Sequence, residues 1–308
     1  MEKQDAIIQI SNLNKHYGDK HVLNNITIDV RKGECLGVIG KNGAGKTTMF
    51  ECIENIKKWE SGSILIKGKD ITKNGKAVKK VLGVQLQSSS LPNDIKVEEA
   101  IKLFAVENHV KYSKKEYKEL YKKFSLEENL QKRYKQLSTG QKRRVHLLIA
   151  ILHDPEIVIL DEPTAGLDIE GKDKLYNVIK ELMEQGKTFL ISSHDMQEVE
   201  KLCDRVAFVL DGKIVKIEDM NSNTLQNENT VICMKMHKAA SNDQKKFSFG
   251  EFIEHDNGYD EYRCTSIISF LKEFIDSPIT DDNEIQDIFI RKSSIEKELV
   301  DLIKGDEQ

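Results

Sequence analysis

The sequence lacks any apolar segment long enough to cross a bilayer. Its longest purely apolar run, residues 147–152, is far shorter than the roughly 20 residues that a membrane-spanning helix needs. The N-terminus, MEKQDAIIQI, has no apolar stretch followed by a small-residue cleavage site, so no secretory signal peptide is expected. These absences predict a cytoplasmic chain that has no membrane spans of its own.

Disulfide pairs and an excess of basic charge are also missing. The five cysteines are scattered and form no CxxC pair, which favours free thiols in a reducing compartment over disulfides or a metal site. The net charge is -4 and the pI is about 6.1, so no global basic field argues for nucleic acid, and no nucleic-acid partner is expected. A hydrophobic fraction of 39% fits a globular protein with a substantial core.

Strand and helix patterns alternate along the first 220 residues. Residues 35–39, 157–160 and 189–192 are short apolar runs typical of buried parallel strands, whereas residues 47–56 and 169–185 have helical patterns. This alternation predicts an α/β domain with a mainly parallel core sheet. Residues 6–30 are rich in strand-forming residues, with a turn expected at Asn24-Asn25, and we assign them to an N-terminal antiparallel β subdomain.

The remaining segments suggest three further parts. Residues 97–136 are helical and highly charged, with nine Lys or Arg against five Glu between residues 107 and 135. A solvated helical face is the default explanation, and contact with a partner or with anionic lipid headgroups is the alternative. Residues 221–230 are polar and linker-like. Residues 231–308 contain strand patterns at 231–236, 261–265 and 285–290, and helix patterns at 267–275 and from 293 onward. We therefore predict a main α/β domain over 1–220 with a helical subdomain at 97–136, a linker at 221–230, and a small α+β domain at 231–308.

The strongest motif is a glycine-rich loop between the strand at 35–39 and the helix that follows. It reads GKNGAGKT and matches the phosphate-binding loop pattern, the alternative being an ordinary glycine turn. Its backbone N–H groups can wrap phosphates at a helix N-terminus, while Lys46 neutralises the β- and γ-phosphates and Thr47 binds Mg²⁺. The predicted nucleotide-binding residues here are Gly40, Asn42, Gly43, Ala44, Gly45, Lys46, Thr47 and Thr48.

A second motif places two carboxylates at the end of an apolar strand. Asp161 and Glu162 follow residues 157–160, which puts them at the carboxyl edge of a parallel sheet, beside the glycine-rich loop. Asp161 is predicted to hold Mg²⁺, and Glu162 to act as the general base that polarises the attacking water. An isolated Asp-Glu pair would usually be a solvated turn, but the strand before it favours the functional interpretation.

A third motif carries a family resemblance. Residues 137–141 read LSTGQ, just before the strand at 157–160, and this resembles the ABC signature, whose usual form is LSGGQ. The resemblance covers residues 6 to about 217 and implies ATP and Mg²⁺ as cofactors. It also implies that Ser138, Thr139, Gly140 and Gln141 of one subunit close over the γ-phosphate held by the loop of another. Because one chain carries one loop and one signature, the resemblance implies a head-to-tail dimer, most simply a homodimer.

Other family elements follow in order. Tyr17 resembles the aromatic residue that stacks on adenine, a core tyrosine being the alternative. Gln87 resembles the glutamine that senses Mg²⁺ and the γ-phosphate, with Gln85 as a competitor. Asp168, in AGLD, resembles the D-loop aspartate at the subunit interface. His194 resembles the switch histidine that contacts the γ-phosphate, although a lone histidine is often structural.

The resemblance implies the transport-coupled ATPase of a polytopic membrane permease on a separate chain, located on the cytoplasmic face of the cell membrane. Residues 83–105 and 293–303 are similar to subunits of drug- and bacteriocin-type exporters, which favours export. The alternatives are an importer subunit and a soluble ABC ATPase acting on ribosomes or nucleic acid; a small-molecule kinase is more distant.

The sequence departs from the family pattern in two places: Thr139 replaces a signature glycine, and the D-loop reads AGLD where SALD is usual. If position 139 required positive φ, threonine would weaken closure.

Overall fold

The computed structural model describes residues 6–85, 90–220, 230–236, 247–256, 258–264, 267–275 and 285–292 of the 308-residue chain. The chain divides into two compact units, Met1–Asn221 and Ser222–Gln308. Within the described ranges, no helix is both long and apolar enough to span a membrane.

The first unit begins with an antiparallel sheet in the strand order β2-β1-β4-β5. Its strands are β1 (Ala6–Tyr17), β2 (Lys20–Arg31), β4 (Ser61–Ile66) and β5 (Lys69–Asp70). The turn predicted at Asn24-Asn25 is wrong, because both residues lie inside β2. Asn25 has φ +56°, a conformation that asparagine tolerates well, and the pairing with β1 is irregular there, so the strand continues past the asparagines.

The main sheet has six strands in the order β10-β9-β3-β8-β7-β6. These are β3 (Cys35–Ile39), β6 (Leu82–Gln85), β7 (Ile157–Asp161), β8 (Thr188–Ser193), β9 (Arg205–Leu210) and β10 (Lys213–Asp219). All neighbouring pairs are parallel except β9 with β10. Every residue of β3, β7 and β8 is buried, as expected for strands covered on both faces. The predicted α/β fold with a mainly parallel core is confirmed.

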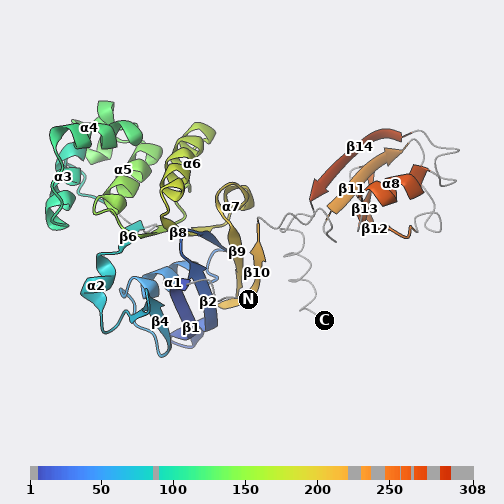
Figure 1. Cartoon of the computed structure of the whole chain (residues 1–308), viewed down its shortest axis with the longest axis horizontal. Helices are drawn as coiled ribbons and strands as arrows, with labels where there is room; N and C mark the ends of the chain where they lie inside the picture. The colour runs from blue at the N-terminus through green and yellow to red at the C-terminus, as the bar shows by residue number, and fades with distance from the viewer. Residues whose placement is uncertain are drawn as a thin grey trace. The chain divides into compact units, whose positions relative to one another are not determined.

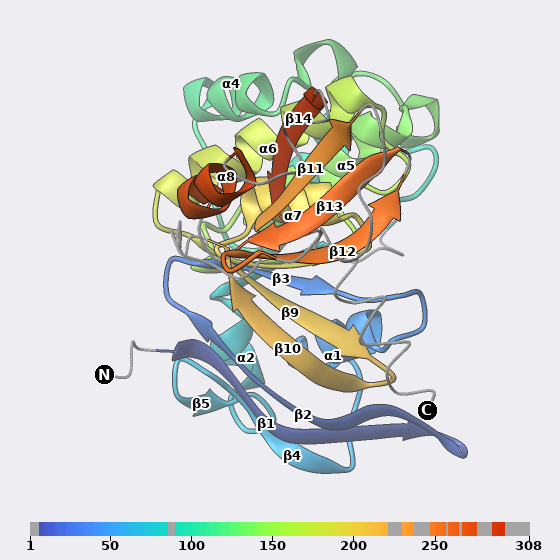
Figure 2. The same ribbon diagram turned by 90° about the vertical axis from the view of Figure 1, so that its right-hand side faces the viewer.

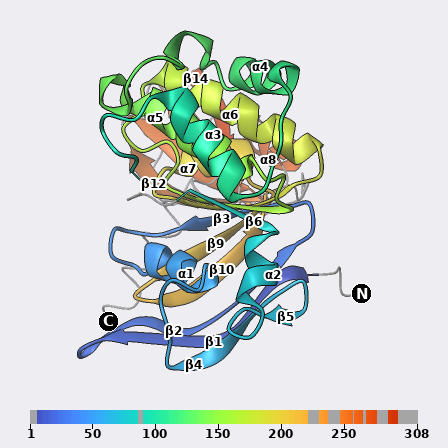
Figure 3. The same ribbon diagram turned by 90° about the vertical axis from the view of Figure 1, so that its left-hand side faces the viewer.

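Helices cover both faces of this sheet. In Figures 1 and 3, α3 to α6 lie on one face, whereas α1 and the antiparallel sheet lie on the other. The segment predicted to be helical, 97–136, contains α3, α4 and two short 3₁₀ turns. The bounds are α1 (Lys46–Ile53), α2 (Gly75–Lys79), α3 (Val97–Glu107), α4 (Lys114–Lys123), η1 (Glu127–Asn129), η2 (Tyr134–Gln136), α5 (Thr139–Ile151), α6 (Ile169–Glu184) and α7 (Met196–Leu202).

The second unit is a four-stranded antiparallel sheet with one described helix, as Figure 2 shows. Its elements are β11 (Thr230–Met236), β12 (Gly250–Asp256), β13 (Tyr259–Cys264), α8 (Ile267–Ile275) and β14 (Ile285–Lys292). Its core includes Ile232, Met234, Tyr262, Phe270 and Phe274. Strand β12 was not predicted. Of the linker predicted at 221–230, residues 221–229 lie outside the described residues and Thr230 begins β11. The helix expected from residue 293 also lies outside the described residues.

A buried histidine in α5 predicts a pH-dependent stability. His146 is 8% exposed and shares a 2.8 Å hydrogen bond between its Nε2 and the Tyr134 hydroxyl. Burial, with the nearby charges of Arg143 and Lys142, lowers its pKa from 6.5 to about 4. The unfolded chain therefore binds the proton first, and the native state should lose about 3 kcal/mol of stability as the pH falls from about 6.5 to about 4.

Chemical denaturation across this pH range tests that expectation. A His146→Gln variant, which cannot titrate, should show a shallower loss of stability on acidification than the parent. The matched control is His109→Asn, because His109 is exposed and has φ +59°. Equal pH slopes for the parent and His146→Gln would contradict the assignment.

Candidate active site

The glycine-rich loop has a backbone that only glycine accommodates at two positions. Gly43 and Gly45 have φ +84° and +106°, values that side-chain-bearing residues rarely adopt. A Cβ atom added to Gly45 would also lie 2.6 Å from the carbonyl oxygen of Val22. The loop turns back on itself where the Ala44 N–H donates to the Lys41 carbonyl at 3.1 Å, and α1 then begins at Lys46. The loop is thus shaped to present backbone groups at a helix N-terminus.

Lys46 lies inside this loop. Its side chain is 5% exposed, and its Nζ donates to the carbonyl oxygens of Gly40 at 2.6 Å and Lys41 at 3.2 Å. Burial lowers the pKa of Lys46, while the carboxylates of Glu162 and Asp161 oppose that shift. A buried cation held among loop carbonyls is well suited to binding phosphate oxygens.

Helix α1 and strands β7 and β8 bring the Mg²⁺ candidates together. The fully buried Asp161 ends β7, and one of its carboxylate oxygens accepts from the Thr47 hydroxyl at 2.8 Å. The other oxygen accepts a short hydrogen bond from the Ser192 hydroxyl of β8. Two hard oxygen donors side by side, completed by waters and substrate phosphates, form the kind of set that Mg²⁺ prefers. Thr47 and Asp161 therefore fit a magnesium ion, which would neutralise charge on the transferred phosphate.

Glu162 lies in a strained but firmly held position. Its φ is +47°, unusual for a residue with a side chain, and its N–H donates to both the hydroxyl and the carbonyl oxygen of Ser192, at 3.0 and 3.2 Å. Its Oε1 lies 3.4 Å from His194 Nδ1 and 3.9 Å from Lys46 Nζ. The side chain is only 11% exposed. This arrangement places a carboxylate between a cation and an imidazole, where it can accept a proton from water.

The turn that carries His194 is held in place by hydrogen bonds and an ion pair of its neighbouring residues. The Ser193 hydroxyl donates to the buried carboxylate of Glu198 at 2.6 Å. Asp195 caps α7 by accepting from the Gln197 N–H at 3.0 Å and pairs with Lys172 at 2.7 Å. His194 itself remains 56% exposed. A fixed turn with an exposed imidazole allows His194 to reach a ligand at the sheet edge.

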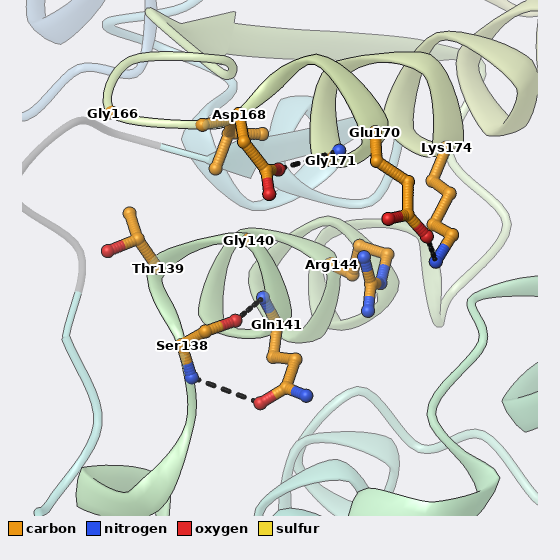
Figure 4. A pocket seen from close by; sticks show the side chains of 11 residues that line it. Ser138, Thr139, Gly140, Gln141, Arg144, Gly166, Asp168, Glu170, Gly171 and Lys174 are labelled. Carbon is orange, nitrogen blue, oxygen red and sulfur yellow. Dashed lines mark hydrogen bonds and ion pairs between the residues drawn. The ribbon is translucent and has the colours of Figure 1, made fainter.

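Ser138 to Gln141 and the D-loop line a separate cavity of about 390 Å³ (Figure 4). Ser138 is the N-cap of α5: its hydroxyl accepts from the Gln141 N–H at 3.3 Å, and the Gln141 side chain accepts from the Ser138 N–H at 3.0 Å. Asp168 caps α6 by accepting from the Gly171 N–H at 2.9 Å. Two helix N-termini thus border one cavity, which favours an anionic ligand there.

Thr139 does not adopt the conformation that would exclude threonine. It is the first residue of α5 and is not among the residues with positive φ. A β-branched side chain is therefore tolerated at this position without backbone strain. The concern that threonine would weaken closure through its φ angle is removed.

The remaining predicted residues are placed as follows. Tyr17 ends β1 and is 44% exposed, so the core-tyrosine alternative does not hold. Asn42 is exposed and Thr48 is half-buried in the first turn of α1. Gln87 lies outside the described residues. Its competitor Gln85 is buried at the end of β6, and neither amide atom has a hydrogen-bond partner within the described ranges.

One contributor was missed from the sequence. Ser192 links Asp161 to Glu162, because its hydroxyl donates to the Asp161 carboxylate and accepts from the Glu162 backbone N–H. A serine at the end of an apolar strand carries no distinctive signal on its own. Knowing that β7 and β8 are neighbours, with Asp161 opposite Ser192, would have identified it.

Comparison with known proteins now decides the family. The ABC transporter profile matches residues 23–165. The Nod factor export ATP-binding protein I of Burkholderia orbicola is 33% identical over 210 residues, covering 68% of this chain and 69% of that protein. The linearmycin resistance ATP-binding protein LnrL of Bacillus subtilis is 32% identical over 213 residues, covering 68% of each. The chain belongs to the ABC transporter ATP-binding proteins.

A solved structure supports the same family assignment. The dimeric structure of an ATP-binding cassette in a post-hydrolysis state, bound to ADP and phosphate, matches with a TM-score of 0.63 and 25% identity. The match covers 70% of this chain and 99% of that cassette. The chain is an ATP-hydrolysing ABC cassette with an additional C-terminal unit.

Proposed function

We propose that this ABC ATPase powers a membrane exporter, that two copies pair head to tail, and that each pair encloses two ATP molecules with Mg²⁺. The observation that supports the pairing most directly is the position of the signature cavity. Ser138, Thr139 and Gly140 border it, whereas no residue of the described glycine-rich loop does. The two halves of a nucleotide site thus face different spaces in one copy, and a second copy can complete each half.

The proposed chemistry follows from the residues around the glycine-rich loop and from the signature residues of a second copy. Lys46 and the loop N–H groups hold the β- and γ-phosphates, and the Thr47 and Asp161 oxygens hold Mg²⁺. Glu162 accepts the proton of the attacking water, while His194 contacts the γ-phosphate from the neighbouring strand. Ser138 and Gly140 of the second copy would close over that phosphate with the N-terminus of α5. Gln87 is proposed to sense the γ-phosphate, Tyr17 to stack on adenine, and Asp168 to lie at the interface between copies.

The proposal that the transporter is an exporter is supported by the descriptions of the relatives. One is described as a Nod factor export protein and another as a linearmycin resistance protein. A permease on a separate chain would carry the cargo and hold the ATPase on the cytoplasmic face of the membrane. The helical subdomain at 97–136 is the proposed contact region. Its α3 exposes Leu103 and Val106, at 57% and 71%, which an apolar partner surface could cover.

Affinity purification from the native host tests this function. Tagged Glu162→Gln protein, purified from detergent-solubilised membranes with ATP, should bring down a polytopic membrane protein in comparable amount. A Leu103→Glu, Val106→Glu variant should lose that partner while keeping ATP binding. Recovery only in the soluble fraction, together with ribosomal proteins or DNA, would overturn the transport assignment and leave the ATPase chemistry standing.

A further inference from the structure

The turn that carries His194 (residues 193–195) is tied together by one buried hydroxyl group. The Ser193 hydroxyl accepts from the Asp195 N–H at 2.9 Å, across the histidine, and donates to the Glu198 carboxylate at 2.6 Å. The Asp195 carbonyl oxygen, at 3.3 Å, is a more distant acceptor for the same proton. Ser193 and Glu198 are each only 1% exposed. Glu198 therefore sets the direction of the hydroxyl that joins the two residues flanking His194.

The buried carboxylate is the stronger of the two side-chain connections to this turn. Burial of a carboxylate is costly unless hydrogen bonds compensate for the lost water, and burial is the main reason that the pKa of Glu198 is raised, while the hydrogen bond from Ser193 opposes that rise. Hydrogen bonds to an ionised acceptor are short and strong. The other connection is the ion pair of Lys172 with Asp195, whose side chains are 30% and 29% exposed, so water screens it.

We propose that Glu198 is a positioning residue for ATP hydrolysis: through the Ser193 hydroxyl it fixes the backbone on both sides of His194. This inference rests on the proposed role of His194 at the γ-phosphate. The imidazole Nδ1 lies 3.4 Å from Glu162 Oε1, and the His194 side chain is 56% exposed, so its position depends on the backbone that carries it rather than on surrounding packing. A displacement of about 1 Å in an active site can cost about a hundredfold in rate.

Steady-state phosphate release by the full-length protein tests the proposal at both ends of the hydrogen bond. Glu198→Ala should lower kcat by about tenfold or more, and Ser193→Ala should lower it to a similar extent. Glu198→Gln keeps an acceptor oxygen for the serine and should stay within about threefold of the parent kcat. KM for ATP should change by less than about twofold in all three variants, because Lys46 makes its hydrogen bonds within its own loop.

A second background separates positioning of His194 from a general loss of stability. In a His194→Ala protein, adding Glu198→Ala should change kcat by less than about twofold, because the side chain that Glu198 positions is already absent. Val199→Ala is the matched control. Val199 is the fully buried neighbour of Glu198 on α7, and its truncation loosens the same helix without removing a hydrogen bond of the turn. Val199→Ala should keep the parent kcat.

Each contrary result has a distinct meaning. A parent kcat in both Glu198→Ala and Ser193→Ala would overturn the inference, and so would equal losses from Glu198→Ala with and without His194, or an equal loss in Val199→Ala. If Glu198→Ala did not fold, as circular dichroism would show, Ser193→Ala in the two backgrounds provides the same comparison. A parent kcat in His194→Ala alone would instead remove the proposed role of His194, and this inference with it.

Discussion

Glu162→Gln should reduce ATP hydrolysis by about a hundredfold or more, the lower end of what a positioned general base contributes. Glutamine has nearly the same shape but cannot accept the proton of the attacking water. The variant should still bind ATP, because Lys46 keeps its hydrogen bonds to Gly40 and Lys41. We expect ATP to trap it as a pair of copies, since the step that separates them would be blocked. Steady-state phosphate release and sedimentation with ATP measure the two effects.

The matched control for this variant is Glu184→Gln, which makes the same chemical change at an exposed position near the end of α6. It should hydrolyse ATP at the parent rate. Turnover by Glu162→Gln at the parent rate would show that another group accepts the proton, and the 3.4 Å neighbour His194 would be examined next.

Lys46→Ala should lower the affinity for ATP by about a hundredfold, because each charge-assisted hydrogen bond to a phosphate contributes about 1.5–3 kcal/mol. Its Nζ is the buried cation of the loop, 3.9 Å from the Glu162 carboxylate. Removing it leaves that carboxylate without its neighbouring positive charge, which would further disfavour a polyphosphate. Isothermal titration calorimetry with ATP and Mg²⁺ gives the affinity, and circular dichroism checks that the fold is intact.

Lys58→Ala is the matched control, because Lys58 is exposed and makes no ion pair within the described residues. It should bind ATP as the parent does. An unchanged affinity in a folded Lys46→Ala protein would contradict the role of the loop lysine. The two largest predictions also differ in kind: Lys46→Ala should prevent pairing, whereas Glu162→Gln should stabilise it.

The sequence was most informative where function depends on neighbours along the chain. The loop at 40–47 and the strand ending in Asp161-Glu162 could be recognised because each motif is continuous and sits at a strand end. The confirmed parallel core followed from fully apolar runs such as residues 157–160. Ser192 could not be assigned, because its role depends on β8 lying beside β7, a pairing of strands about 30 residues apart.

The features that the sequence did not predict correctly have different physical causes. Strand β12 contains several acidic residues, which are depleted in strands, and it forms through pairing with β13 rather than local preference. Asn24-Asn25 resembled a turn because asparagine favours the left-handed region, yet β2 uses that property for an irregularity within a strand. The conformation of Thr139 likewise could not be read from its spacing, since it depends on where α5 begins.

The backbone at Glu162 also sets which substitutions are informative. A φ of +47° is accessible to glycine, asparagine and aspartate, but it is very unfavourable for valine, isoleucine and threonine. In a saturation library at this position, β-branched variants would be lost through misfolding of the turn between β7 and α6, whatever their chemistry. Inactivity across such a library would therefore overstate how strictly the reaction demands a carboxylate. Selections for altered turnover would do better to vary Ser192 and Glu162 together, because the serine holds that turn in place.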